Sequence, residues 1–542
     1  MQGLMMEVPL LISSLIRHAD RYHGDAEIVS RTVEGPIHRY TYRDAHVRAR
    51  RLARALARLG VASSDRIGTL AWNGYRHFEL YYAVSGMGAI THTINPRLFH
   101  DQLVYIIDHA EDRVVFFDLT FAALVEQLAT VCTGVRHWVA MTDRDHLPQT
   151  SVRGLLCYED LLAAESDDFE WPEFDENTAA ALCYTSGTTG NPKGVLFSHR
   201  SSILHAYAIS LPDTKCLSAS SAVLAIVPMF HVNAWGIPYA APLVGCKLVF
   251  PGPALDGASL YHLLESEAVD STSAVPTIWM NLVNYVQQNK LRFSTLRHTT
   301  IGGSACPPAL IKILSEDLGV RVMHGWGMTE MSPVGTLNAP KRKHADASAE
   351  ARFQLSLKQG RPPYGVDMKI VDGEGHELPR DGKSAGSLLV RGPWVLRRYY
   401  KDAGGDPLTA DGWLPTGDVG TIDADGYLQI TDRSKDVIKS GGEWISSIEL
   451  ENIAVGHPAV LEAAVIGVPH AKWTERPLLI VVKRPGADLT RETLLAFYDG
   501  KIARWCLPDD VVFVEELPHT ATGKLSKRML RERFRDYRLP TG

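Results

Sequence analysis

The chain has 542 residues, 45% hydrophobic and 22% charged, and its 62 acidic residues against 56 basic ones give a formal net charge of −6. This length allows about two to four domain-sized units. The net negative charge argues against binding of nucleic acid through the electrostatic field of the whole chain. No apolar run approaches the roughly 20 residues that span a bilayer. The seven scattered cysteines form no Cys-x-x-Cys pair, so we expect a globular cytoplasmic enzyme with no disulfide framework, zinc knuckle, nucleic-acid partner or integral membrane segment.

The first 250 residues alternate between helical and strand patterns. A first helix begins within 8–16, and apolar residues recur at helical spacing over 42–59 and 78–87. Short apolar segments predict strands over 66–71, 114–117, 138–141, 222–227 and 247–250. Strands that alternate with helices of about 10–15 residues favour α/β layers with largely parallel sheets.

The pattern of apolar segments and turn residues changes twice in the last third of the chain. From about residue 360, short apolar segments such as 368–371 and 388–390 alternate with Gly- and Pro-rich turns, which is typical of a compact β region. The remainder reads as a separate α+β domain of roughly 110 residues, with helices over 447–455 and 491–506 and strands over 462–467, 478–482 and 511–514. We therefore expect an α/β protein with a large N-terminal domain, 1–431, that includes a β-rich subdomain at about 360–431, followed by a small C-terminal domain, 432–542.

A segment rich in glycine and hydroxyl groups, Thr185–Gly194, follows the apolar residues 179–183. It combines four hydroxyl side chains and three glycines with Lys193. Glycines let a backbone fold closely around an anion, successive amides form a concave site, and hydroxyls and a lysine add donors. The Walker A pattern is absent. The order of residues favours a cradle for the β- and γ-phosphates of a nucleotide over an ordinary polar turn after a strand.

Two further clusters carry ligand-like chemistry. The segment His324–Glu330 has glycines that permit close backbone approach, and Thr329 and Glu330 offer the oxygen ligands that Mg²⁺ takes beside substrate phosphates; taken alone, Glu330 also fits a helix-start carboxylate. The tripeptide Thr416–Asp418 precedes Arg433 by fifteen residues. A carboxylate there can accept hydrogen bonds from both ribose hydroxyls, although Thr-Gly-Asp by itself is a common turn.

The fourth cluster, Pro518–Lys524, lies near the C-terminus. An isolated lysine is usually a solvated surface residue, but Lys524 follows a Thr/Gly turn suited to presenting it to a cleft. The basic residues that follow it are expected to form the exposed face of a final helix. These are Lys527, Arg528, Arg531 and Arg533.

The four clusters, in this order and spacing, resemble those of the AMP-forming acyl-CoA synthetases. These enzymes belong to the adenylate-forming superfamily, which also holds luciferase-type and peptide-synthetase adenylation enzymes. The resemblance covers essentially the whole chain and is strongest to medium- and long-chain fatty acyl-CoA and 3-methylmercaptopropionyl-CoA ligases. It departs from many members at Asp432, where they have Gly. It implies ATP, Mg²⁺ and coenzyme A as ligands, a small carboxylic acid as substrate, a C-terminal domain that moves about Lys435, and a homodimer.

The resemblance also implies roles for single residues. Lys524 would be the catalytic lysine and His231 would lie near the substrate carboxylate, with Trp235 as the gate of the acyl pocket. Glu330 and Thr185 would hold the metal ion. The residues implied to bind the nucleotide or coenzyme A are Thr185, Ser186, Gly187, Thr188, Thr189, Lys193, Gly303, Ser304, Ala305, His324, Gly325, Trp326, Gly327, Met328, Thr329, Asp418, Arg433, Lys435, Lys439, Gly441, Gly442, Glu443 and Trp444.

The function that follows is an ATP-dependent acyl-CoA ligase. It would activate an acid as acyl-AMP, with pyrophosphate release, and then pass the acyl group to coenzyme A. The segment 229–236 lacks an acidic residue to pair with a substrate amine, which disfavours amino acids and favours a medium-chain fatty acid or 3-methylthiopropionate. Two alternatives stay open: an adenylating enzyme with another acceptor (a separate carrier protein or, as in luciferase, oxygen), and a non-catalytic nucleotide-binding homologue.

Overall fold

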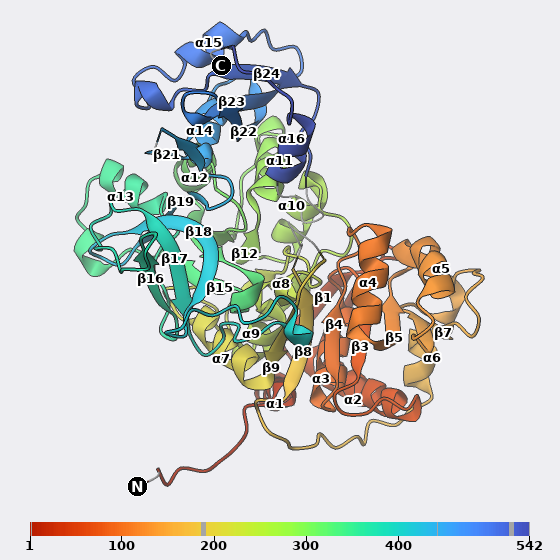
Figure 1. Cartoon of the computed structure of the whole chain (residues 1–542). Coiled ribbons are helices and arrows are strands. Elements are labelled where there is room, and N and C mark those ends of the chain that lie inside the picture. Colours follow the sequence, from red (N-terminus) through yellow and green to blue (C-terminus); the bar gives the residue numbers. More distant parts are fainter. Residues whose placement is uncertain (2, 186–190, 442, 520–524, 541–542) are drawn as a thin grey trace.

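The structure is a computed structural model that describes residues 1, 3–185, 191–441, 443–519 and 525–540. It is a mixed α/β protein with a large N-terminal domain built on three sheets and a small C-terminal domain built on one. Figure 1 shows the C-terminal elements gathered in a lobe of their own, at the end of the molecule opposite the N-terminus. The predicted fold class is confirmed. None of the described helices combines the length and apolar character needed to cross a membrane.

The first sheet has seven strands in the order β7-β6-β5-β3-β4-β8-β9, and only β9 runs antiparallel to its neighbour. Its strands are β3 Arg66–Leu70, β4 Ile90–Thr93, β5 Asp112–Phe117, β6 His137–Ala140, β7 Leu156–Cys157, β8 Ala179–Tyr184 and β9 Gly194–Ser198. Its helices are α2 Tyr42–Arg58, α3 Tyr75–Gly86, α4 His100–Ala110, α5 Ala122–Val131 and α6 Tyr158–Ala163. The two predicted helices are α2, which starts at a capping box of Thr41 and Asp44, and α3.

The second sheet has eight strands in the order β15-β14-β13-β12-β10-β11-β1-β2, parallel except for β2 and β15 at the edges. Its strands are β1 Glu27–Arg31, β2 Ile37–Thr41, β10 Ala222–Leu224, β11 Lys247–Phe250, β12 Ser271–Ala274, β13 His298–Ile301, β14 Arg321–Gly327 and β15 Val334–Leu337. The accompanying helices are α1 Ile12–His23, α7 His199–Ser210, α8 Val232–Trp235, α9 Ile237–Val244, α10 Gly257–Ser266, α11 Pro276–Gln288, α12 Pro308–Lys312 and α13 Ala349–Ser356. One buried cluster contains apolar residues of α1, α3, α7 and α9 together with residues of both sheets, so these helices join the sheets.

The predicted strand over 222–227 is wrong in its last three residues. Beyond β10 the carbonyl oxygens of Ala225 and Val227 accept hydrogen bonds from the side-chain amide of Asn73, at 2.6 and 2.8 Å. These bonds satisfy the backbone in place of a strand neighbour, so the chain leaves the sheet there.

The predicted turn-rich β region is confirmed as a four-stranded antiparallel sheet, β16-β17-β18-β19. Its strands are β16 Asp367–Val371, β17 Gly386–Arg391, β18 Leu414–Ile422 and β19 Leu428–Arg433. A turn over 434–436 leads from β19 into the last sheet, so one short turn connects the β-rich region to the C-terminal elements.

The C-terminal sheet has the order β21-β20-β23-β22, with β24 beside β23. Its elements are β20 Ile438–Ser440, β21 Glu443–Ile445, α14 Ser447–Val455, β22 Val460–His470, β23 Thr474–Lys483, α15 Arg491–Ala496, β24 Asp510–Val514 and α16 Lys527–Arg533. The predicted helix over 491–506 is wrong beyond Ala496. The backbone of Gly500 has φ +73°, in the left-handed region, which a continuous helix excludes.

The final helix, α16, also differs from the prediction. The side chain of Lys527 is only 9% exposed, and its Nζ lies 2.7 Å from Glu451 of α14. Arg531 pairs with Asp436, in the turn before β20, at 2.7 Å. Of the four basic residues expected on an exposed face, Arg528 and Arg533 are exposed, whereas Lys527 and Arg531 hold α16 against the start of the small domain.

Candidate active site

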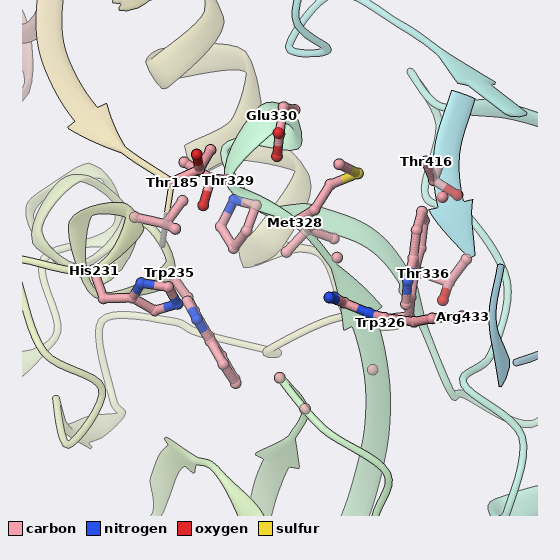
Figure 2. A pocket seen from close by; sticks show the side chains of 18 of the residues that line it. Thr185, His231, Trp235, Trp326, Met328, Thr329, Glu330, Thr336, Thr416 and Arg433 are labelled. Carbon is pink, nitrogen blue, oxygen red and sulfur yellow. The ribbon is translucent and has the colours of Figure 1, made fainter. Parts of the chain in front are cut away.

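A cavity of about 400 Å³ lies where the two large sheets, the β-rich sheet and the turn over 434–436 meet. It is lined at one side by residues of α8 and at the other by residues of β18, of β19 and of the turn after β19 (Figure 2). The predicted site residues that line it are Thr185, Lys193, His231, Trp235, Gly303, Gly325, Trp326, Gly327, Met328, Thr329, Glu330, Arg433 and Lys435. Segments that are far apart in sequence therefore meet at one cavity.

Other predicted residues are not brought to this cavity or are not described. Ser186, Gly187, Thr188, Thr189, Gly442 and Lys524 lie outside the described residues. Ser304 and Ala305 follow β13 without lining the cavity. Lys439, Gly441 and Trp444 belong to the β20–β21 hairpin and are also outside the lining, and the backbone of Glu443 belongs to the same hairpin. Their assigned roles stay predictions.

His324 lies in the middle of β14 and is 2% exposed. Its Nδ1 is 2.9 Å from the carbonyl oxygen of Leu357, and burial lowers the pKa of His324 to about 4. The neutral imidazole of His324 is held by the backbone of Leu357, and His324 does not line the cavity.

Antiparallel pairing explains how Asp418 and Arg433 meet. The two residues stand directly opposite each other on β18 and β19, and Arg433 Nε lies 3.4 Å from Asp418 Oδ1. Asp418 Oδ2 accepts a hydrogen bond of 2.8 Å from the indole Nε1 of Trp326. The carboxylate is thus held by contacts from β14 and β19. Asp418 itself is not among the lining residues, but its partners Trp326 and Arg433 are, and these two lie with Thr416 on one side of the cavity (Figure 2).

Another part of the cavity lining carries the carboxylate of Glu330 and the hydroxyls of Thr329 and Thr185. Glu330 lies in the short 3₁₀ helix Thr329–Met331 and is 8% exposed. Its Oε1 accepts a hydrogen bond of 2.8 Å from the hydroxyl of Tyr399, and burial raises the pKa of Glu330. Thr329 precedes Glu330 in the same 3₁₀ helix, and Thr185 lines the same cavity (Figure 2). A buried carboxylate in a cavity that two hydroxyl side chains also line fits a hard divalent cation such as Mg²⁺.

Thr185 and Lys193, near the two ends of the glycine-rich segment, are hydrogen-bonded to each other. The backbone N–H of Thr185 donates to the carbonyl oxygen of Lys193 at 2.9 Å, and the N–H of Lys193 donates to Thr185 Oγ1 at 3.2 Å. The ammonium of Lys193 lies 4.7 Å from the ring centroid of Tyr399. These contacts bring a cation to the wall that also carries Glu330.

His231 and Trp235 are placed by an unusual turn. All four residues of α8 have positive φ, from 47° to 52°, and a left-handed turn of this kind costs roughly 1–2 kcal/mol per residue outside glycine. The side chain of Asn233 within it accepts a hydrogen bond of 3.1 Å from the buried Tyr81 hydroxyl. Surrounding structure thus holds a strained segment, a situation typical of functional sites, and the turn puts both rings on the same side of the cavity (Figure 2).

The cavity lining also contains residues to which the sequence assigned no individual role. Of these, Asn191, Val232, Thr416 and Gly417 lie inside segments that the sequence singled out, and Gly302 and Ser434 adjoin assigned residues. The others are Lys215, Thr300, Pro333, Val334, Thr336, Leu337 and Tyr399. Lys215 and Tyr399 lie in segments without a motif, and no pattern in the sequence pointed to them.

Comparison with known proteins extends the similarity over the whole chain. The family described as AMP-binding enzyme matches residues 15–400, and the AMP-binding enzyme C-terminal domain matches residues 449–524. The chain is 54% identical over 538 residues to 3-methylmercaptopropionyl-CoA ligase of Ruegeria lacuscaerulensis, covering 99% of both chains. It is 50% identical over 536 residues to medium-chain-fatty-acid–CoA ligase of Ectopseudomonas oleovorans, covering 99% of this chain and 98% of that one.

Solved structures share the fold. The structure of the anthranilate CoA ligase AuaEII in complex with anthranoyl-AMP superposes with a TM-score of 0.87 at 25% identity and covers 98% of both chains. ATP-bound MatB from Rhodopseudomonas palustris superposes with a TM-score of 0.81 at 26% identity and covers 97% of this chain and 99% of that one. The similarity therefore includes both the large and the small domain.

Proposed function

The chain belongs to the AMP-binding enzymes and is an AMP-forming acyl-CoA ligase, for which we propose a medium-chain fatty acid or 3-methylthiopropionate as the acid. Such a ligase joins its acid to the α-phosphate of ATP, releases pyrophosphate, and then passes the acyl group to coenzyme A. The observation that supports the proposal most strongly is a single cavity with the Asp418–Arg433 pair at its edge and His231 and Trp235 on the opposite wall. The residues assigned to the two substrates of the first step therefore face one cavity.

We assign the nucleotide to the side of the cavity that carries Trp326 and Arg433. The carboxylate of Asp418 would accept hydrogen bonds from the ribose hydroxyls, and Trp326 and Arg433 would keep it in place. The glycines of 325–327 leave space for the adenine, and Thr185 and Lys193 would meet the phosphates. Charge-assisted bonds of this type orient the α-phosphate for attack.

The metal ion is assigned to Glu330 and Thr185. Glu330 is a buried carboxylate whose described contact is the hydroxyl of Tyr399, so a divalent cation would supply the charge that compensates its burial. When bound, Mg²⁺ would neutralise charge on the phosphates of the leaving pyrophosphate. Thr185, fixed by its bonds to Lys193, would present its hydroxyl to the same ion.

The reacting groups need a cation between them. Carboxylate and triphosphate are both anions, and a lysine placed between them stabilises charge that develops in the transition state. We assign this role to Lys524, with His231 beside the acid's carboxylate. No side-chain nucleophile is required, because the acid itself attacks the phosphorus.

The second step is assigned to a rearranged form of the same chain. We place the domain boundary between residues 431 and 432 and the pivot at Lys435, in the short turn before β20. Rotation about this turn would withdraw Lys524 and bring the β20–β21 hairpin, with Lys439, Gly441, Gly442, Glu443 and Trp444, toward the acyl-adenylate and coenzyme A. Two glycines in that hairpin would allow the thiol arm to approach the backbone.

Location and assembly are also part of the proposal. All seven cysteines are free and six of them are buried, which is consistent with the reducing cytoplasm. The homodimer and the lack of a nucleic-acid partner stay predictions. Another acceptor than coenzyme A is disfavoured, because full-length relatives at 45–54% identity are named as CoA ligases.

A panel of acids tests the substrate. Among 3-methylthiopropionate and the unsubstituted acids from propionate to palmitate, we expect 3-methylthiopropionate or an unbranched medium-chain acid to give the highest kcat/KM for coenzyme A-dependent AMP formation. This expectation rests on the two similar ligases named for 3-methylmercaptopropionyl-CoA and for medium-chain fatty acids. A maximum at palmitate, or no AMP with any of these acids, would contradict the assignment.

A further inference from the structure

A buried lysine stands beside Trp235 in the wall of the cavity. Lys215 lies in the loop between α7 and β10 and is 2% exposed. Its Nζ donates a hydrogen bond of 2.6 Å to the hydroxyl of Ser273 on β12 and lies 5.5 Å from the ring centroid of Trp235. Because Lys215 also lines the cavity, its ammonium reaches the side assigned to the acid.

This ammonium has little compensation from the protein. Lysine is almost never fully buried unless it is paired, yet no described carboxylate pairs with Lys215, and burial alone lowers its pKa to about 7. The neighbouring imidazoles of His205 and His298 cannot offset the positive charge, because an imidazole is neutral or positive, and burial lowers the pKa of both. An ammonium has three donors; one is used by Ser273, so donors are left for a ligand.

A second polar group lies next to the first. Thr300 of β13 stands opposite Ser273 in the register of the two parallel strands, so both side chains point to the same face of the sheet. The Oγ1 of Thr300 is buried and has no hydrogen-bond partner among the described residues. Thr300 lines the same cavity as Lys215.

The position of this pair relative to the nucleotide indicates what it contacts. Thr300 lies within β13, His298–Ile301, and Gly302 and Gly303 come after the strand, so Thr300 lies deeper in the sheet than these glycines. A Cβ at Gly302 would lie 3.5 Å from the tip of the Trp235 ring. Trp235 therefore reaches from the strand end toward Lys215, and the pair occupies the inner part of the acyl side, away from the Asp418–Arg433 edge.

We propose that Lys215 and Thr300 bind a hydrogen-bond-accepting oxygen at the far end of the acid, so that the preferred substrate is an ω-oxygenated medium-chain acid. The proposal rests on the ligase function and narrows its acid. A plain alkyl chain would leave the remaining donors of Lys215 and the Thr300 hydroxyl buried without partners, and sites built to hydrogen-bond a substrate group reject analogues that lack it. A hydroxyl and a carboxylate share this acceptor chemistry.

The test compares three acids of equal length: the alkyl acid, its ω-hydroxy derivative and the α,ω-dicarboxylic acid. We expect the wild-type enzyme to favour at least one oxygenated acid over the alkyl acid by about 10-fold or more in kcat/KM for AMP formation. Lys215→Met, which keeps the side-chain length and removes the donor, is expected to reduce that ratio about 10-fold. Thr300→Val, a change of similar shape, should reduce it in the same direction. The hydroxy and dicarboxylic arms show whether the acceptor is neutral or anionic.

The controls separate this proposal from the function on which it rests. Lys312→Met changes an exposed lysine of α12 and should leave the ratio unchanged. Preference for the alkyl acid in the wild type, or equal ratios in the wild type and both variants, would overturn the proposal while the ligase function stands. If the wild type activated none of the acids at any length, the ligase assignment itself would fall, and the role of Lys215 with it. The wild-type ratio keeps the proposal falsifiable should Lys215→Met fail to fold.

Discussion

Replacing Lys524 with alanine is expected to reduce acid-dependent pyrophosphate release by about 100- to 1000-fold. In the proposed mechanism this ammonium stands between the carboxylate and the α-phosphate, where it offsets the repulsion of two anions as the new bond forms. Binding of ATP to the large domain should change little, because the residues assigned to the nucleotide lie elsewhere. The measurement is the rate of pyrophosphate release with saturating ATP and acid.

The second half-reaction provides the internal comparison for Lys524→Ala. With the acyl-adenylate and coenzyme A supplied, thioester formation should stay within a few-fold of the wild type, since the lysine is withdrawn in that step. Lys501→Ala, a change at an exposed lysine of the same domain, should affect neither step. An equal loss in both half-reactions would remove Lys524 from the proposed role.

Replacing Glu330 with glutamine is expected to lower kcat/KM for ATP by about 100-fold and to raise the Mg²⁺ concentration needed for half-maximal activity about 10-fold. The amide keeps an oxygen that can accept the hydrogen bond from Tyr399, so the local fold is preserved while the charge that attracts the cation is lost. The measurement is AMP formation as a function of free Mg²⁺ at fixed ATP.

A matched surface change controls for general effects of removing a negative charge. Glu316 is exposed and pairs loosely with Lys312 at 3.8 Å, and such pairs contribute little. Glu316→Gln should therefore leave both parameters unchanged. If Glu330→Gln kept the wild-type Mg²⁺ dependence, the metal ion would have to be held by other residues.

Local sequence patterns predicted the helices and strands correctly where the spacing of apolar residues matches the face that the element buries. The helix over 42–59 has one apolar face and a cap, and it was found within one residue at its end. The predicted bounds were wrong where contacts with residues far away in the sequence determine where an element begins or ends. Asn73 ends β10 through its bonds to Ala225 and Val227, and every residue of α3 is buried, so its first turn showed no periodicity.

The residues of the candidate site also fall into two groups: those that belong to a local motif, and those placed by contacts between distant parts of the chain. The sequence singled out the glycine-rich segments and the Asp418–Arg433 pair because each motif is contiguous or recurs at a known distance in the chain. The contact of Lys215 with Ser273 joins residues 58 positions apart, through a loop that carries no motif. The left-handed turn over 232–235 depends on a hydrogen bond from Tyr81 to Asn233 across 152 positions, which no local pattern contains.

The fate of the acid's oxygen atoms tests the central claim most directly. If the carboxylate attacks the α-phosphorus of ATP, the bridging oxygen stays with AMP when the thiol of coenzyme A displaces it. With an acid labelled with oxygen-18 in its carboxylate, mass spectrometry should find a single labelled oxygen in the AMP and none in the pyrophosphate. Label in inorganic phosphate, or AMP without label, would contradict the proposed acyl-adenylate.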